Sequence, residues 1–235
     1  MLLVNLISFC ALSQEKKKPR MHTWIGIGPS VIKYKINLLH SADPKPKSAV
    51  SFFVHEEIYI RNWASLVSGL GYFGHGLGFS SYYFKPDELK LYNGEFNYTY
   101  SMRLHELQIP MKLKIDFSKN KQSRKAIFVQ TGLVVRNVFS GSLEVTEAKT
   151  GKLVYYGDPS HRFYSTLVGG KWGSNVELSI GYSKKVGTGK NAMFFSMNYL
   201  RQLNQSYIEP KSSGFFAADL KHTSSGIQFI LGFEF

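Results

Sequence analysis

The feature that most constrains this chain is the strict alternation of side chains at its C-terminal end. Apolar residues take every second position there, with mostly small or polar residues between them: the first set is Ile227, Phe229, Leu231, Phe233 and Phe235, and the second is Gln228, Ile230, Gly232 and Glu234. Successive side chains of a β-strand point to opposite faces, so this segment predicts a strand with one oily face. Segments around Leu178 and Val129 repeat the pattern, which indicates an all-β protein.

The longest apolar run covers residues 1–13, which is too short for a membrane-spanning helix of about 20 residues. The sequence therefore excludes a helical membrane protein. It does not exclude a transmembrane β-barrel, whose strands alternate instead of forming long apolar runs. The composition, with 43% hydrophobic and 15% aromatic residues, suits a packed β-rich fold and not a disordered chain.

The N-terminal run predicts a secretory signal peptide over residues 1–13. Its apolar core extends from Leu2 to Phe9, and Ala11 and Ser13 are small residues suited to cleavage before Gln14. The only cysteine, Cys10, would leave with this peptide, so we expect no disulfide and no thiol chemistry. A lipidated Cys10 is disfavoured because Phe9 is too large for the residue before it. Residues 14–21 then form a basic periplasmic segment, and residues 22–235 form the barrel.

Turn signals divide the rest of the chain into eight strand-like runs. They cover approximately His22–Asn37, Ser48–Ile60, Trp63–Ser80, Tyr98–Phe117, Lys125–Gly141, Ser165–Lys184, Asn191–Asn204 and Ala217–Phe235. The connections alternate between short (61–62, about 118–124 and 185–190) and long (38–47, 81–97, 142–164 and 205–216). Short periplasmic turns and long outer loops are typical of small outer-membrane barrels. We therefore predict an eight-stranded antiparallel transmembrane β-barrel in the bacterial outer membrane.

A soluble β-sandwich or a lipocalin-like barrel is the alternative fold. Two features favour the membrane barrel instead: aromatic residues end the oily faces, and bulky charges lie on the opposite faces. These charges predict a salt-bridge network that fills the lumen, in preference to a proton or substrate path. The predicted network is Glu106, Lys112, Lys114, Arg136 and Glu177.

The chain carries 29 Lys and Arg residues against 16 Asp and Glu, a formal net charge of +13. Most of this excess falls in the N-terminal segment and the short connections, so we interpret it as a basic periplasmic rim and not as a nucleic-acid surface. The rim could meet an acidic periplasmic protein or anionic lipid, or it could simply keep the turns solvated. Its residues are Lys119, Lys121, Arg124, Lys125, Lys184, Lys185 and Lys190.

The segment from Glu106 to Lys114 reads ELQIPMKLK and resembles the strand pattern YLEIPLLLK of the PorT-like small outer-membrane barrels of Bacteroidota. The matching residues are Leu107, Ile109, Pro110, Leu113 and Lys114, Met111 is a close apolar substitute, and the departures are Glu106, Gln108 and Lys112. This resemblance implies an outer-membrane barrel of about eight strands. One branch of the family serves type IX secretion and gliding.

In this strand, the apolar residues Leu107, Ile109, Met111 and Leu113 share one parity, whereas Tyr98, Tyr100, Met102 and Leu104 share the other. If both sets face lipid, the switch near His105 and Glu106 predicts a β-bulge in this strand. Pro110 has no N–H to donate, so we expect it where the strand pairing is already perturbed.

Two other motifs resemble sites with known chemistry. Gly69-Leu-Gly-Tyr-Phe-Gly74 has the letters of a dinucleotide fingerprint but lies in a strand with no helix after it, so we expect no cofactor. The histidines other than His222 have no metal-ligand spacing, so we expect no metal site. His222, Ser224 and Glu234 resemble the catalytic set of an outer-membrane lipid A deacylase, although they lie far apart along one strand. Phe233 and Phe235 resemble the C-terminal signal for the outer-membrane assembly machinery.

The function expected from the sequence is that of a non-enzymatic outer-membrane barrel. Its expected partners are outer-membrane lipid, the assembly machinery, and a periplasmic or secretion-complex protein, for which the family resemblance suggests type IX secretion. A small pore or ligand-binding barrel is the main alternative, and a lipid A-modifying enzyme is a remote one.

Overall fold

The structure is a computed structural model that describes residues 21–37, 45–46, 48–81, 98–117, 125–157, 159–164, 172–186, 191–210 and 220–235. The predicted signal peptide and residues 14–20 lie outside this part of the chain. Strands and the turns between them make up the described residues. Within those ranges, no helix is long and apolar enough to cross a membrane.

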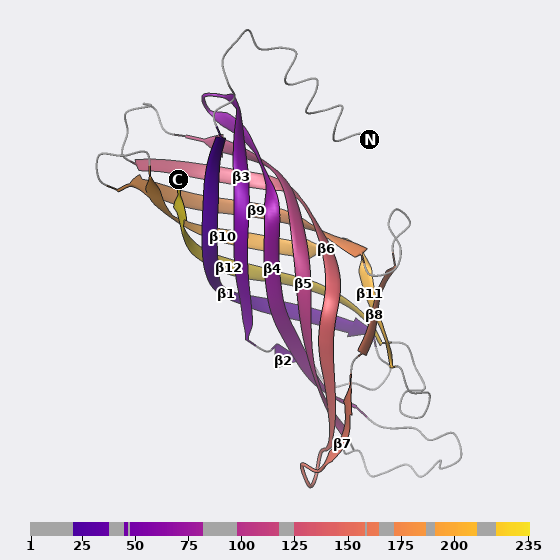
Figure 1. Cartoon of the computed structure of the whole chain (residues 1–235). Coiled ribbons are helices and arrows are strands. Elements are labelled where there is room, and N and C mark those ends of the chain that lie inside the picture. Colours follow the sequence, from indigo (N-terminus) through magenta and orange to yellow (C-terminus); the bar gives the residue numbers. More distant parts are fainter. Residues whose placement is uncertain are drawn as a thin grey trace.

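Eight long strands form a closed ring, as predicted (Figure 1). Each strand pairs antiparallel with the next, and β1 pairs with β12 to close the ring. The strands are β1 (Met21–Asn37), β3 (Ala49–Arg61), β4 (Ala64–Ser81), β5 (Tyr98–Asp116), β6 (Lys125–Glu147), β9 (Trp172–Lys185), β10 (Ala192–Gln202) and β12 (Leu220–Glu234).

Within the described residues, four short strands extend the sheet at the end that carries the long connections. They are β2 (Lys45–Pro46), β7 (Leu153–Gly157), β8 (Pro159–Tyr164) and β11 (Gln205–Pro210). β2 pairs with β4, β7 pairs with β6, and β11 pairs with both β12 and β8. The prediction of plain loops over 142–164 and 205–216 is therefore wrong in part. Backbone pairing extends these strands past the membrane, where no oily outer face is needed and the alternation signal is lost.

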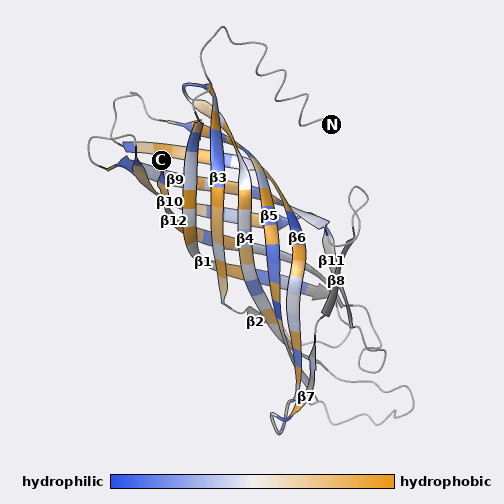
Figure 2. Cartoon of the chain, in the orientation of Figure 1, coloured by the Kyte–Doolittle hydropathy of each residue, from blue (hydrophilic) through white to orange (hydrophobic). Residues whose placement is uncertain are grey.

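The outward face of the ring is oily over a band of limited height. In β12 the outward residues from Ile227 to Phe235 are all large and apolar, and in β9 Val176, Leu178, Ile180 and Tyr182 alternate with buried polar residues. The hydropathy colouring in Figure 2 shows this alternation along the strands. From Ile227 to Phe235 the strand rises about 26 Å, or about 20 Å along the membrane normal at a typical barrel tilt. This height is comparable to the apolar band of about 25 Å that outer-membrane barrels present to the hydrocarbon.

The predicted bulge is present in the β5–β6 pairing, but its extra residue lies in β6. His105 pairs with Ser140 and Glu106 pairs with Val138, so Phe139 has no partner in β5. β5 keeps one parity throughout, so the assumption that Tyr98, Tyr100, Met102 and Leu104 also face lipid is wrong. Tyr100, Met102 and Leu104 are buried inside the barrel. Their apolar character reflects an apolar interior at this end of the barrel, which a two-fold sequence pattern cannot distinguish from a lipid-facing surface.

Pro110 lies beside a gap in the pairing between β4 and β5. The pairs Ser68–Met111 and Gly71–Gln108 are formed in one register, but none joins Gly69 or Leu70 to the residues across from them. A proline fits at such a gap because it has no N–H to donate. The perturbation that accommodates Pro110 is therefore on the β4 side and is separate from the β6 bulge.

Gly69 makes this gap possible and gives a first testable prediction. Its φ angle is +149°, and a Cβ added there would lie 2.3 Å from the carbonyl oxygen of Val54. We expect Gly69→Ala to lower the free energy of unfolding by about 1–3 kcal/mol, because an L-residue is strained in this conformation and meets rigid backbone. Guanidine unfolding of the refolded barrel in lipid vesicles measures the change.

Gly71 provides the matched control, since it lies on the same strand and face as Gly69. An added Cβ there would meet its nearest atoms at 3.5 Å, which is ordinary contact. Gly71→Ala should change stability by less than Gly69→Ala does. Equal losses in the two variants would show that Gly69 has no special role.

Candidate functional site

The inward face of β5 carries the charged residues that dominate the lumen. Glu106, Lys112 and Lys114 all lie on this face, and each is almost fully buried. Residues of one parity along a strand point the same way, so the three form a column along the inside of the barrel. Each of them has an oppositely charged partner on another strand.

The first group lies toward the short-turn end and is built around Lys114. Its Nζ lies 2.9 Å from a carboxylate oxygen of Glu57 on β3 and 3.4 Å from Asp116. The Ser65 hydroxyl donates to Glu57 at 2.5 Å. The ammonium also lies 4.2 Å from the centre of the Trp24 ring, a cation–π contact. Lys114 thus joins β5 to β1 and β3 across the lumen.

The second and third groups lie farther along β5. Lys112 Nζ lies 2.5 Å from Glu177 on β9. Glu106 lies 3.3 Å from Arg136 on β6 and 2.9 Å from Nε2 of His75 on β4. His75 can donate from Nε2 to Glu106 while Nδ1 accepts the hydroxyl of Tyr34, which satisfies all three groups.

The sequence-predicted network is therefore brought together, but not as one cluster. Glu106 meets Arg136, Lys112 meets Glu177, and Lys114 meets Glu57, which the sequence analysis missed. His75, Tyr34 and Trp24 were also missed. The signal for Glu57 was available: it shares parity with Ser51 and His55 and opposes Phe52 and Val54 on β3.

Uncharged polar residues fill the opposite side of the lumen. The hydroxyls of Ser30 and Ser51 lie 3.0 Å apart, and the Gln228 amide donates to Ser51 at 2.9 Å. These bonds join β1, β3 and β12. Among the uncharged side chains of the described residues, four buried atoms have no hydrogen-bond partner: Trp24 Nε1, Gln108 Nε2, Asn175 Oδ1 and Asn198 Oδ1.

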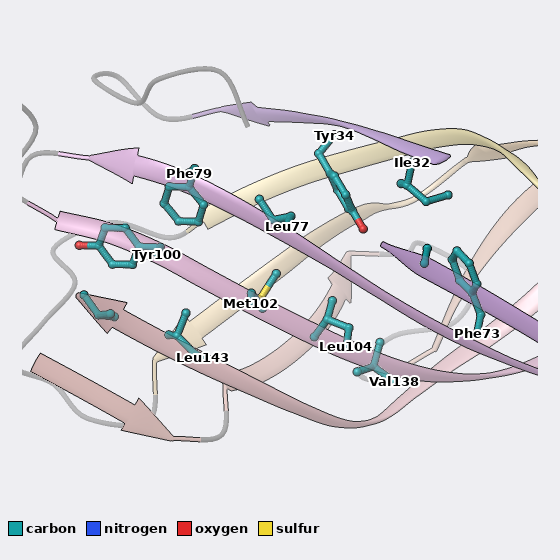
Figure 3. Packing of buried hydrophobic residues seen from close by; sticks show 12 residues of the cluster. Ile32, Tyr34, Phe73, Leu77, Phe79, Tyr100, Met102, Leu104, Val138 and Leu143 are labelled. Atoms are coloured by element: carbon teal, nitrogen blue, oxygen red, sulfur yellow. The ribbon is translucent and has the colours of Figure 1, made fainter. Parts of the chain in front are cut away.

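At the long-connection end, the lumen is filled by apolar side chains, whose packing Figure 3 shows. Buried side chains from β1, β3, β4, β5 and β6 pack together there, and we call them the apolar plug. The plug consists of Ile32, Tyr34, Ala49, Phe73, Leu77, Phe79, Tyr100, Met102, Leu104, Val138, Leu143 and Val145. A smaller apolar cluster of Trp24, Phe128, Phe194 and Ile230 lies toward the short-turn end of the barrel. The lumen is thus lined by a packed core along much of its length.

The family-motif residues divide between the two faces of β5. Leu107, Ile109, Met111 and Leu113 face outward, whereas Pro110 and Lys114 face the lumen. The motif therefore gives a lipid-facing row together with the residue that organises the first ion-pair group.

The predicted basic rim lies only partly within the described residues. Lys125 and Lys184 are exposed cross-strand partners at the short-turn end, and Lys185 is exposed beside them. Lys119, Lys121, Arg124 and Lys190 lie outside the described residues. Phe233 and Phe235 face outward at the same end, and the backbone of Phe235 bonds with that of Thr23 at the seam between β12 and β1.

The possible deacylase residues are not brought together. The Ser224 hydroxyl donates to Gln202 at 2.8 Å, whereas Glu234 pairs with His22 at 2.6 Å. Ser224 and Glu234 are separated by about 33 Å along β12. Among the described residues, no group of three His, Cys, Asp or Glu side chains could hold a metal ion.

Comparison with known proteins agrees with the closed ring and its oily outer band. The family model described as "Outer membrane protein beta-barrel domain" matches residues 13–207. No curated protein sequence matches the chain. Among solved structures, the chain is similar to the outer membrane protein OprG from Pseudomonas aeruginosa, at 10% identity and a TM-score of 0.55, with 94% of this chain and 98% of that chain covered.

Two further structures resemble the chain more distantly. Neisserial surface protein A is 11% identical, covers 93% of this chain and 98% of its own, and gives a TM-score of 0.42. The attachment invasion locus protein Ail of Yersinia pestis is 9% identical, covers 92% and 99%, and gives 0.36. At such identities a likeness to solved structures concerns the fold alone. On the family match and the architecture described above, the chain belongs to the outer membrane protein beta-barrel domain family and is located in the bacterial outer membrane.

Proposed function

We propose that this protein is a non-enzymatic outer-membrane barrel that docks other envelope proteins at its ends and does not conduct solutes through its lumen. The observation that carries the proposal is the pairing of charges inside the barrel. Three buried acids, Glu57, Glu106 and Glu177, each lie within 3.3 Å of a buried base. Charges arranged in this way neutralise one another and fill space, whereas a conducting lumen leaves its charges hydrated.

The apolar plug supports the same conclusion from the other end of the lumen. Leu77, Met102 and Leu104 have at most 1% of their surface exposed. Packed side chains of this kind leave no room for a continuous column of water. With the lumen occupied, the surfaces left for function are the two rims and the outer wall.

The type IX secretion and gliding apparatus is the assembly that we propose for this docking role. The support is the resemblance of the segment Glu106–Lys114 to the PorT-like family, combined with the basic residues at the short-turn end. That end is periplasmic in bacterial outer-membrane barrels. A basic rim there is suited to an acidic surface on a periplasmic subunit.

Charge reversal at the basic rim tests the docking role. We expect Lys125→Glu combined with Lys184→Glu to abolish co-purification of a periplasmic subunit from detergent-solubilised envelopes, because close like charges at an interface are costly. Quantitative mass spectrometry of the captured proteins measures the loss. The control reverses Lys149 and Lys152, which are exposed near the β6–β7 turn at the opposite end. Equal recovery with both double variants would contradict docking at the rim.

A small pore or polar-ligand barrel is the second candidate function. It is favoured by the buried atoms of Gln108, Asn175 and Asn198 that lack hydrogen-bond partners, because such groups are usually satisfied by water or a ligand. Planar bilayer recordings distinguish the two functions. We expect no stepwise conductance from the intact protein, and reproducible steps would favour the pore.

A further inference from the structure

A group of basic side chains lies on the outer wall of the barrel, away from the lumen and from the basic rim. Lys33 and Lys35 on β1 and Arg201 on β10 are all exposed, whereas their neighbours Ile32 and Leu200 are buried inside. Alternate residues of a strand point to opposite faces, so the three basic side chains face outward. We call these three residues the outer basic group.

Strand register places the outer basic group on neighbouring strands at one height. Lys33 pairs with Ser225 of β12, and Ser225 pairs with Arg201 of β10. Lys35 pairs with Thr223, and this pair is the next outward-facing pair toward the long connections. Paired Cα atoms lie about 4.5–5.5 Å apart, so the backbones of Lys33 and Arg201 are separated by about 10 Å. Two long cationic side chains at that separation can reach the same anion, with the Ser225 hydroxyl between them.

The outer basic group lies at the edge of the oily band. The next outward-facing residues toward the short turns, two positions along each strand, are Val31, Ile227 and Tyr199. They are paired in one row and are exposed. Two residues along a strand correspond to about 7 Å. The cations therefore lie at the depth where lipid headgroups meet the hydrocarbon, and a tyrosine is present at the same boundary.

The charge of this surface is of one sign among the described residues. The outward positions of β1, β10 and β12 beyond the oily band are Lys33, Lys35, Arg201, Ser225 and Thr223, and none of these is acidic. The group is at the end with the long connections, which faces the outer leaflet in bacterial outer-membrane barrels. That leaflet carries phosphorylated glycolipid headgroups.

We propose that Lys33, Lys35 and Arg201 bind the phosphate group of a glycolipid headgroup in the outer leaflet. The planar guanidinium of Arg201 can donate two hydrogen bonds to the phosphate, and the two ammonium groups contribute point charges. The Ser225 hydroxyl lies between Lys33 and Arg201, the Thr223 hydroxyl lies beside Lys35, and both can donate to the remaining oxygens. Bound lipid would fix this side of the barrel against the membrane.

Binding of purified lipid A tests the proposal on the intact protein. Native mass spectrometry in detergent compares lipid A with the same lipid after its phosphates are removed, so the acyl chains are identical. We expect the wild-type protein to prefer the phosphorylated lipid by roughly tenfold or more. No preference in the wild type would overturn the proposal without reference to any variant.

The variants locate the site. We expect Lys33→Gln combined with Arg201→Gln to remove the preference for the phosphorylated lipid, and Arg201→Gln alone to reduce it. Arg103→Gln is the matched control, because Arg103 is an exposed, outward arginine on β5 whose cross-strand partners, Gly76 and Ser142, are uncharged. A preference that survives the double variant, or one that is lost equally in Arg103→Gln, would contradict the assignment. If the double variant fails to refold, Arg201→Gln against Arg103→Gln decides the question.

Discussion

Replacing Glu106 with alanine should destabilise the barrel by about 3–5 kcal/mol, the largest effect that we expect from a single lumen substitution. Glu106 has none of its surface exposed, and its carboxylate faces both Arg136 and His75. Removing it leaves a buried guanidinium without its counter-charge. The penalty is that of an uncompensated buried charge and exceeds the value of the lost contact itself.

Equilibrium unfolding in guanidine, with the protein refolded into lipid vesicles, measures this change. Glu144→Ala is the control, because Glu144 lies on the exposed face of β6 and should change stability by no more than about 0.5 kcal/mol. A loss at Glu106 no larger than the loss at Glu144 would show that the lumen is hydrated enough to screen Arg136.

A double variant separates charge pairing from packing. Glu106→Leu combined with Arg136→Met removes both charges and keeps apolar volume, so it should recover most of the stability lost in Glu106→Ala. Such recovery would mean that the role of the pair is to fill the lumen and not to supply an essential charge. Failure to recover would indicate that another group, such as His75, depends on the Glu106 carboxylate.

The fold was accessible from the sequence because one physical rule governs the membrane-spanning region. Where hydrocarbon covers one face and the lumen lies behind the other, residues such as Ile180 and Ser179 must alternate. Eight such runs were visible, and their ends differ from the observed strands mostly by a few residues. The same rule fails beyond the membrane, where β6 continues to Glu147 and β7, β8 and β11 form without an oily outer face.

The apolar plug shows a second limit of this rule. Tyr100, Met102 and Leu104 have the alternation of a lipid-facing row, yet they face inward. The sequence shows which residues share a face but not which side of the sheet that face is on. The register shifts beside His105 because β6 has one extra residue, Phe139. This shift is a property of the pairing between β5 and β6, so neither strand shows it alone.

The site could be predicted residue by residue but not pair by pair. Parity alone placed Lys112 and Glu177 in the lumen, and the structure brings them within 2.5 Å. Partner choice depends on the tilt and register of strands that are not adjacent, so Lys114 was assigned to the lumen without its partner Glu57. Glu57 was missed because its segment was interpreted as a strand without an inner face being assigned to it.

The outer wall provides the other large effect, which we expect from Leu231→Arg. Leu231 faces outward near the middle of the oily band of β12, with 53% of its surface exposed. In water, an arginine at such an exposed position would cost little. In a bilayer, an arginine on the lipid face near the midplane costs about 2–4 kcal/mol, so the free energy of unfolding from vesicles should fall by that amount.

Leu153→Arg is a closely matched control, because Leu153 is also a leucine and is 54% exposed, but it lies in β7 beyond the oily band. We expect this change to leave stability within about 0.5 kcal/mol of the wild type. The two substitutions are alike in residue type and exposure and differ in what covers the side chain. A large loss at Leu231 alone would therefore measure the lipid contact itself, whereas equal small effects would mean that hydrocarbon does not cover this face of β12.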